Sequence, residues 1–539
     1  MNKVFAVLLI LALSPLAAYA AHTPAPAAQA ALDRATALDK EKKPEQALAA
    51  FVQAIEIDLD FLAAHDQLIE FRSEWGEAAY QHKDLKPQVD AMKKTIDAKY
   101  KEWEQRFPDS AGIQYGIGTR LWREEDPGAK PHLLKVLAHD PKNAKVYYML
   151  SIDAERWGDK KASSEYMHQA SLLEPQNADY AFYAATIGDV EPSKREAASL
   201  DVARRFPTSE RGAQALYWLA AAAPDDAKRI AFSEQLRTQF PPEKFHWSAD
   251  GMIGLFEAYL RVDPAKSVKL AQEMRGGKDL EESKEWSARV TLAQTYIEVN
   301  SKVASGKTDE AVALLDKLTV DRFSSNTAML LILKARVMAG AGQVQGAYDS
   351  LLKQQAKAPD DEILAALYST GKPLHKTAAQ VDVDLKAALD AGAKEAAPFD
   401  LQQYGSNGTV SLAKLRGKVV FITFWFPGCG PCRAEMPHTE TVLRELHDKD
   451  IVYLGINGVS DQDAYVLPFM QKTQYSFTPL KGTDAVTGPK GYNVRGYPSN
   501  FLIDRSGRVV YHGFVIDDAH GEMLERRMLE SLLARPARK

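Results

Sequence analysis

The first two thirds of the chain carries one hydrophobic pattern throughout. Over residues 27–368, apolar residues recur at spacings of three and four, and alternating runs of β-branched residues are scarce. This periodicity places the apolar side chains on one face of an α-helix. The pattern therefore predicts a long succession of helices.

Prolines divide this helical region at nearly equal intervals. Five prolines that each follow an apolar helix end are spaced 33, 34, 32 and 34 residues apart: Pro108, Pro141, Pro175, Pro207 and Pro241. Proline cannot continue a helix, but it is tolerated where the next one starts. A period near 34 with proline after the second helix resembles divergent tetratricopeptide repeats, which we predict over residues 27–370. An irregular helical bundle is the alternative, because the small-residue positions of such repeats are often filled by larger side chains.

A repeat array of this kind buries each helical pair only against its neighbours and forms a curved solenoid. Such surfaces usually bind proteins, so a protein partner on the repeat surface is predicted, although nothing in the sequence identifies it. Residues 371–396 are rich in Ala, Lys and Asp. We interpret them as a linker or capping helix.

The pattern changes at about residue 397. Residues 419–426 form a continuous β-branched and aromatic run, which is typical of a strand buried on both faces. Further strands are predicted at 451–456, 500–503 and 508–514, and helices at 433–447, 461–473 and 521–534. The order β-α-β-α-β-β-α predicts an α/β thioredoxin fold over residues 397–539. The fold class is therefore two-part, an all-α repeat solenoid followed by this domain.

The start of the chain predicts export. A positive charge at Lys3 precedes the apolar run 4–13, and Ala18 and Ala20 supply small residues for a peptidase. We interpret residues 1–20 as a cleavable signal peptide of a bacterial protein, which predicts a periplasmic or secreted location. An uncleaved membrane anchor is the alternative, and membrane association is expected only in that case.

Composition and charge argue against a disordered chain and against a nucleic-acid-binding protein. The chain is 45% hydrophobic and 26% charged, with a net charge of -5. These values are typical of globular protein, and no basic excess points to nucleic acid.

Cysteine use directs attention to one motif. The chain has two cysteines, Cys429 and Cys432, and an exported protein that used disulfides as staples would scatter more pairs. The Cys-Gly-Pro-Cys motif follows the buried strand and opens a helix, where backbone N–H groups and the macrodipole stabilise a thiolate. We therefore expect Cys429 to be an exposed attacking thiol and Cys432 to resolve the mixed disulfide. A zinc site would need four ligands, so no metal and no cofactor is predicted.

Several segments around the motif resemble one known family. Residues 397–401, 410–412, 415–420, 424–425, 433–437, 496–498 and 501–504 are similar to the TlpA/ResA-like thioredoxin family in the same order. The resemblance implies an exported disulfide oxidoreductase, usually one that reduces disulfides in other proteins. It also implies substrate contacts at Trp425, Tyr497 and Pro498.

The resemblance further implies a cis-proline and a catalytic acid. Pro498 is expected in the cis form, presenting the backbone of Tyr497 to a substrate, whereas a trans loop proline is the alternative. Glu435 lies one helical turn after Cys432 and is expected to relay its protons, whereas a solvated helix glutamate is the alternative. Thr423 occupies the strand position where cytoplasmic thioredoxins carry a buried Asp, and Gly428 replaces the usual Trp of the family.

The sequence thus predicts a thiol–disulfide oxidoreductase that reduces disulfides in partner proteins, with disulfide-containing or dithiol proteins as partners. Two alternatives stay open. One is a protein-binding scaffold with a redox-regulatory module, and the other is an oxidant that forms disulfides.

Overall fold

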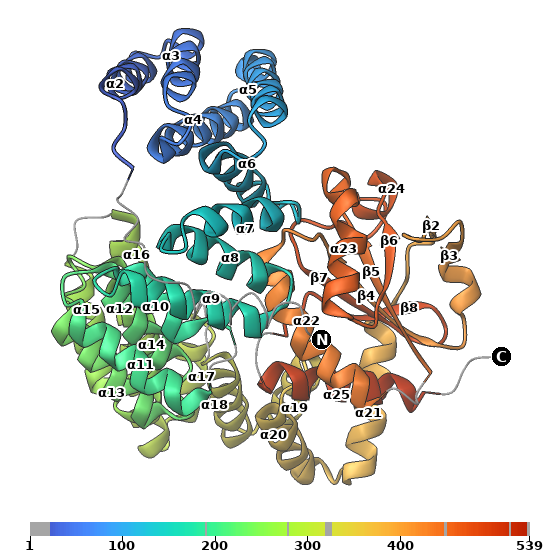
Figure 1. Ribbon diagram of the computed structural model, residues 1–539. Helices are drawn as coiled ribbons and strands as arrows, with labels where there is room; N and C mark the ends of the chain where they lie inside the picture. Colours follow the sequence, from blue (N-terminus) through green and yellow to red (C-terminus); the bar gives the residue numbers. More distant parts are fainter. Residues whose placement is uncertain are drawn as a thin grey trace. The chain divides into compact units, whose positions relative to one another are not determined.

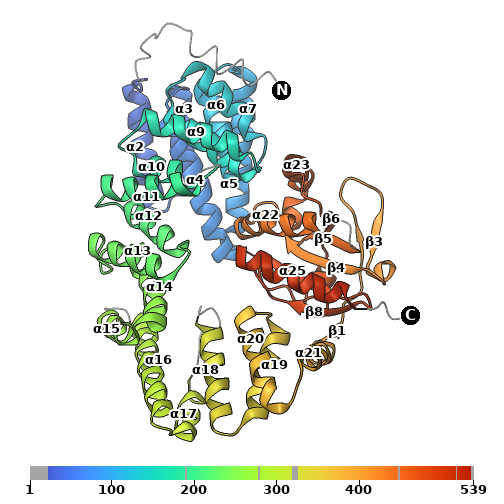
Figure 2. The same ribbon diagram turned by 90° about the horizontal axis from the view of Figure 1, so that it is seen from below.

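The computed structural model describes residues 22–188, 191–276, 280–318, 326–446, 450–516 and 519–535 (Figures 1 and 2). The predicted signal peptide and His447, the last residue of one predicted helix, lie outside these ranges. The chain divides into two compact units. Unit 1 runs to residue 155 and includes 159–175, and unit 2 contains residues 156–158 and everything from 176 onward.

Unit 1 is helical in all of its described elements. Its helices are α2 (Pro26–Lys40), α3 (Pro44–Ile57), α4 (Leu62–Gln81), α5 (Lys86–Arg106), α6 (Ala111–Arg123), α7 (Ala129–His139), α8 (Ala144–Arg156) and α9 (Lys160–Leu173). Neighbours along the chain pack against each other, most extensively α2 with α3 and α6 with α7.

Unit 2 begins with twelve more described helices before its sheet. They are α10 (Ala178–Thr186), α11 (Pro192–Arg205), α12 (Glu210–Ala221), α13 (Asp226–Gln239), α14 (His246–Val262), α15 (Pro264–Met274), α16 (Leu280–Ala304), α17 (Thr308–Leu315), α18 (Thr327–Gly340), α19 (Val344–Lys357), α20 (Asp361–Gly371) and α21 (Ala378–Gly392). Helices also pack against their next-but-one neighbours, as α12 does against α10 and α14. The helical character predicted from the sequence is confirmed.

The five periodic prolines all stand just after helices. Each lies two residues beyond a helix end, after α5, α7, α9, α11 and α13. The pairing of helices and the proline positions agree with a repeat array, but the tetratricopeptide assignment itself stays a prediction.

The remainder of unit 2 is an α/β domain with a mixed sheet. Its elements are β1 (Lys394–Glu395), β2 (Asp400–Gln402), β3 (Thr409–Ser411), β4 (Val419–Trp425), α22 (Gly430–Glu445), β5 (Ile451–Asn457), α23 (Asp463–Thr473), β6 (Thr478–Lys481), α24 (Asp484–Thr487), β7 (Ser499–Ile503), β8 (Arg508–His512) and α25 (Ala519–Leu533). The six-stranded sheet has the order β1-β8-β7-β4-β5-β6, while β2 and β3 form a separate hairpin. Strands β4, β5 and β6 are parallel, and β7 runs antiparallel to β4. This arrangement is the thioredoxin fold that the sequence predicts.

Strand β4 lies at the centre of the domain because both of its faces are buried. Phe421 and Trp425 point into the core beneath α22, α23 and α25, whereas Ile422 and Phe424 point into the core on the other face. All seven residues of the strand are buried, which explains the uninterrupted apolar run in the sequence. A strand fixed on both faces gives the loop that follows it a rigid support.

Some elements differ from the sequence prediction. Strand β8 ends at His512 rather than residue 514, and α22 begins at Gly430 rather than residue 433. Strands β1, β2, β3 and β6, each of four residues or fewer, are not among the predicted strands. Within the ranges that the structure describes, every helix is too short or too polar to span a bilayer.

Candidate redox site

The two cysteines form a disulfide where helix α22 begins. Their sulfurs are 1.99 Å apart, and the Cα atoms are 5.3 Å apart. Cys429 is the N-cap residue, and its Sγ accepts a hydrogen bond of 3.1 Å from the backbone N–H of Cys432. The backbone N–H of Cys432 has no partner within the helix and points at this sulfur. Together with the positive end of the helix dipole, it favours negative charge on the sulfur once the disulfide is reduced.

The predicted exposure of Cys429 is not found in this disulfide form. Cys429 is 3% exposed and Cys432 is 1% exposed, and both belong to the core cluster that contains Trp425 and Met436. The sulfur of Cys429 turns inward because it is bonded to Cys432 and caps the helix. Because neither sulfur protrudes from the surface, a substrate has to approach the disulfide along the motif loop.

The loop before Cys429 is held by two hydrogen bonds to Gly428. The Gly428 N–H donates to Oε1 of Gln462 at 2.7 Å, and the Gly428 carbonyl accepts from Nη2 of Arg433 at 3.1 Å. These side chains come from the turn before α23 and from α22, so two elements fix the backbone at the position where the family usually has Trp.

A cis peptide bond joins Tyr497 to Pro498. Pro498 immediately precedes β7, and β7 pairs with β4 through Ser499 and Phe424. The cis bond and the cysteine loop therefore lie at the same end of the sheet. The Tyr497 ring makes an edge contact with Phe426, its hydroxyl donates to the Gly458 carbonyl at 3.0 Å, and burial raises the pKa of that hydroxyl.

Glu435 is buried on α22, one helical turn after Cys432, which excludes the alternative of a solvated helix glutamate. Only 5% of the residue is exposed. Its Oε2 accepts a hydrogen bond of 2.9 Å from Nδ2 of Asn500, and its Oε1 accepts one of 2.9 Å from the backbone N–H of Ile516. Buried polar groups are stable only with such partners.

Asn500 and Ile516 were missed by the sequence interpretation. Asn500 pairs directly with Thr423 in the sheet, and its side chain also donates to the Phe514 carbonyl at 3.1 Å. A buried amide in an otherwise apolar strand was the signal that could have revealed this partner of Glu435.

Trp425 does not occupy the position that its predicted substrate contact requires. Its side chain is 0% exposed and packs against Phe469 and Phe477, with ring centroids 5.0 Å away in each case. As the last residue of β4 it points into the core, because alternate side chains of a strand face opposite sides. The indole supports the motif loop from beneath and cannot contact a docked protein here.

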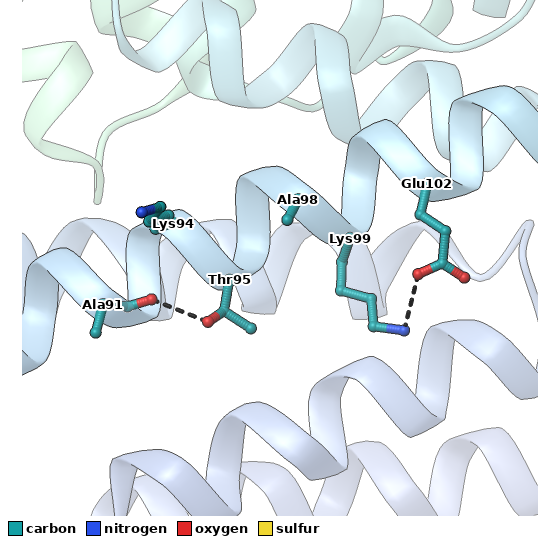
Figure 3. A pocket seen from close by; sticks show the side chains of 6 residues that line it. All are labelled: Ala91, Lys94, Thr95, Ala98, Lys99 and Glu102. Atoms are coloured by element: carbon teal, nitrogen blue, oxygen red, sulfur yellow. Dashed lines mark hydrogen bonds and ion pairs between the residues drawn. The ribbon is translucent and has the colours of Figure 1, made fainter.

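Two hollows on the surface lack the chemistry of the cysteine site. One lies along α5 in unit 1 and contains a Lys99–Glu102 ion pair of 3.2 Å; its lining is Ala91, Lys94, Thr95, Ala98, Lys99 and Glu102 (Figure 3). The other lies beside Arg416 and Arg508, whose guanidinium groups pair with Glu395 and Asp504. Across the described ranges, no three His, Cys, Asp or Glu side chains are grouped to hold a metal ion.

A dithiol motif at a helix start, a cis-proline at the same sheet end and a thioredoxin sheet define the class of this domain. It is a thioredoxin-like domain of the thiol–disulfide oxidoreductase class. Comparison of the sequence with protein families agrees, because residues 378–532 match the Redoxin family. The carboxy-terminal part of the chain is therefore a Redoxin domain.

Known relatives match the same part of the chain. The thioredoxin-like protein YneN of Bacillus subtilis is 29% identical over 168 residues, which cover 30% of this chain and 88% of YneN. The thiol-disulfide oxidoreductase ResA of Halalkalibacterium halodurans is 30% identical over 104 residues, which cover 19% of this chain and 57% of ResA. The chain thus spans a little over half the length of that ResA protein.

A solved structure from Chlorobium tepidum, assigned provisionally to the thiol:disulfide interchange protein DsbE, is 29% identical. The match covers 26% of this chain and 96% of that one, with a TM-score of 0.24.

Proposed function

We propose that this protein is an exported reductase of disulfides in other proteins, acting through Cys429 and Cys432. The observation that carries the proposal is the disulfide at the start of α22 with the buried Glu435 carboxylate in the same core. The bond joins residues three apart, so it closes a very short loop and contributes little as a staple compared with bonds that close long loops. Reversible redox chemistry is the better reason for such a pair.

The reaction begins from the reduced dithiol. The Cys429 thiolate attacks one sulfur of a partner disulfide, forming a Cys429–partner bond while the other partner sulfur leaves as a thiolate and takes up a proton. Cys432 then gives its proton to the Glu435 carboxylate. The resulting Cys432 thiolate attacks Sγ of Cys429, and the second partner sulfur leaves with the electron pair of the broken bond.

The net result is a reduced partner and the oxidised pair seen in this structure. Two electrons move from the dithiol to the partner, so a separate dithiol donor must regenerate Cys429 and Cys432 for each turnover. The Tyr497–Pro498 segment supports substrate docking in this scheme, since a cis-proline turns the backbone of Tyr497 toward the end of the sheet where the cysteines lie.

Export and recruitment complete the proposal. Residues 1–20 direct the chain out of the cytoplasm, and the surface of the repeat-like helices binds a protein partner. The residue pattern at the start of the chain and the extended set of paired helices support these two points.

Reduction of insulin disulfides by the full chain tests the catalytic proposal. We expect Cys429→Ser to lower the rate to that of the uncatalysed reaction, because the attacking sulfur is lost. Cys432→Ser keeps the first step and should accumulate a disulfide-linked complex that a reductant releases. Equal rates for wild type and Cys429→Ser would exclude the proposed function.

Equilibration with thiol–disulfide buffers tests the direction of electron flow. A reductase should have a potential well below the value of about -120 mV of a strong dithiol oxidant. A value near that limit would instead identify a protein that forms disulfides.

A further inference from the structure

Glu525 is a second buried carboxyl in the redox domain. It lies on α25 at 0% exposure, on the same buried stripe as Met528, Leu529 and Leu532. Neither of its carboxylate oxygens has a hydrogen-bond partner among the residues that the structure describes. An isolated buried carboxylate is so unfavourable that such a group keeps its proton instead.

Helix α25 lies beside α22, the helix that carries the cysteines (Figures 1 and 2). Nδ1 of His438 on α22 is 2.7 Å from Oε1 of Glu522 on α25, and further along the same helices Glu445 pairs with Arg526. The two helices therefore run in the same direction. Glu525 lies one turn after Glu522, on the side of α25 that is buried against the sheet.

The charged and titratable groups around Glu525 come from three elements. The negative charges of Glu435 on α22 and Glu522 on α25 raise the pKa of Glu525, whereas the positive charge of Arg526 on α25 lowers it. On β5, burial raises the pKa of the Tyr453 hydroxyl, and the negative charges of Glu525, Glu440 and Glu435 raise it further. Glu440 is bonded to Arg444 and Ser476. Among the described residues, Arg526 is the cation that lowers the pKa of Glu525, and it is paired with Glu445.

The two interior acids have opposite surroundings. Glu435 accepts hydrogen bonds from Asn500 and from the Ile516 N–H, and such donors favour the charged form. Glu525 has no donor, and burial together with the like charge of Glu435 raises its pKa well above the ordinary value. Interacting carboxyls of this kind titrate as a pair, with one proton held far more tightly than the other.

We propose that Glu525 is a positioning residue of the redox site: its protonated carboxyl limits the interior beside Cys432 to a single negative charge, which stays on Glu435. The inference rests on the proposed function, because it concerns the proton that Cys432 gives to Glu435. In alkaline solution Glu525 loses its proton to solvent, and two like charges then share the interior. These two charges disfavour a third negative charge nearby, so the Cys432 thiolate forms less readily, and closure of the disulfide slows.

Single-turnover oxidation of the reduced full-length protein tests this inference. The rate at which the Cys429–Cys432 disulfide forms is measured over roughly pH 6–10 with excess insulin as oxidant, because this range brackets the thiol pKa of about 8.5. At about pH 9 we expect Glu525→Gln to be faster than wild type by about tenfold, which corresponds to one unit of pKa at Cys432. Toward the acid end of the range the two rates should converge, because a wild-type Glu525 that keeps its proton is neutral like the Gln.

Two further variants separate electrostatics from a structural effect. Glu525→Asp keeps an ionisable carboxyl and should keep the alkaline fall in rate. Glu530→Gln removes a carboxylate from the exposed side of the same helix and should follow wild type. A ratio of Glu525→Gln to wild type that is constant across the pH range would overturn the inference.

The protonation state of Glu525 has its own readout. The infrared spectrum of the oxidised protein at neutral pH should show a carboxylic-acid C=O band that is missing in Glu525→Gln and retained in Glu530→Gln. Its absence from wild type would also overturn the inference. If wild type and Cys429→Ser reduce insulin equally, the proposed function fails and the inference fails with it, whereas a normal wild-type rate with no pH effect of Glu525→Gln refutes the inference alone.

Discussion

Unit 1 and the redox domain both bury ionisable side chains, but they surround them differently. In unit 1, His65 is completely buried and both of its ring nitrogens are bonded, Nδ1 to the Tyr100 hydroxyl and Nε2 to the Leu59 carbonyl, each at 3.0 Å. In the redox domain, Glu525 is equally buried and has no hydrogen-bond partner among the described residues.

The difference shows what each region requires of its interior. A buried group with all of its bonds made fixes one arrangement of helices. A buried acid without partners lowers stability, and such costly groups cluster where a protein moves protons or electrons. The buried histidine of unit 1 therefore serves packing, whereas the buried acid of the redox domain serves the proton chemistry of the site.

Acid should destabilise unit 1, and this is the largest effect that we expect. Burial lowers the pKa of His65 from 6.5 to about 4. Because the unfolded chain takes up a proton below pH 6.5 and the folded one does not, stability is complete above that pH and is lost as the pH falls toward 4. The loss amounts to about 3 kcal/mol. Hydrogen exchange of the α4–α6 amides as a function of pH measures it.

The exposed His139 provides the control for this prediction. His65→Gln should flatten the pH dependence between about 6.5 and 4, while His139→Gln should leave it as in wild type. If both variants keep the slope of wild type, His65 is not the group that links acid to the stability of unit 1.

The sequence predicted the fold of both regions because their patterns are long. Spacings of three and four repeat through many helices, and the run over β4 has seven buried residues. The short strands left no such trace. Strand β6 has four residues with Pro479 among them, and it lies at the edge of the sheet, where proline is tolerated.

The candidate site could be predicted from the sequence only where its functional residues are close together along the chain. The cysteine pair and its place before a helix could be inferred from the motif alone. Asn500 and Glu525 could not, because their roles depend on which strand or helix lies opposite. The family resemblance assigned Trp425 to the substrate surface, but the alternation of β4 turns its side chain into the core.

Rising pH should destabilise the redox domain, in the direction opposite to unit 1. The pKa of Glu525 is raised above its unfolded value of about 4.5, so the folded protein binds more protons than the unfolded chain above that pH. Stability then falls by about 1.4 kcal/mol per pH unit until the folded pKa is reached. Urea unfolding of Glu525→Gln should show a gain over wild type that grows with pH through this window.

The exposed Glu530 again supplies the control. Glu530→Gln should show no such growth, since its side chain is exposed to solvent in the folded chain as it is in the unfolded one. A gain of Glu525→Gln that is equal at all pH values would indicate that the carboxyl acts through its shape and not through its charge.

Two glycines test the comparison at the level of single side-chain contacts. A Cβ at Gly116 would lie 2.6 Å from Nδ1 of His65, and one at Gly458 would lie 2.1 Å from the Tyr497 hydroxyl oxygen. Gly116→Ala should cost about 1–3 kcal/mol through overpacking and leave insulin reduction unchanged. Gly458→Ala displaces the tyrosine that precedes the cis-proline, so it should raise the KM for insulin by about tenfold, or about 1.4 kcal/mol.

Gly496, which precedes Tyr497, provides the matched control because a Cβ there would meet no atom within 4 Å. Gly496→Ala should keep the KM of wild type, so that any loss in Gly458→Ala is traced to the tyrosine ring and not to the loop backbone. Reduction of insulin by the three full-length variants, together with their melting temperatures, measures both quantities. If Gly116→Ala lowers activity as much as Gly458→Ala while the folded fraction stays complete, then the interior of unit 1 is linked to catalysis, and the division between a packing histidine and a chemical acid is wrong.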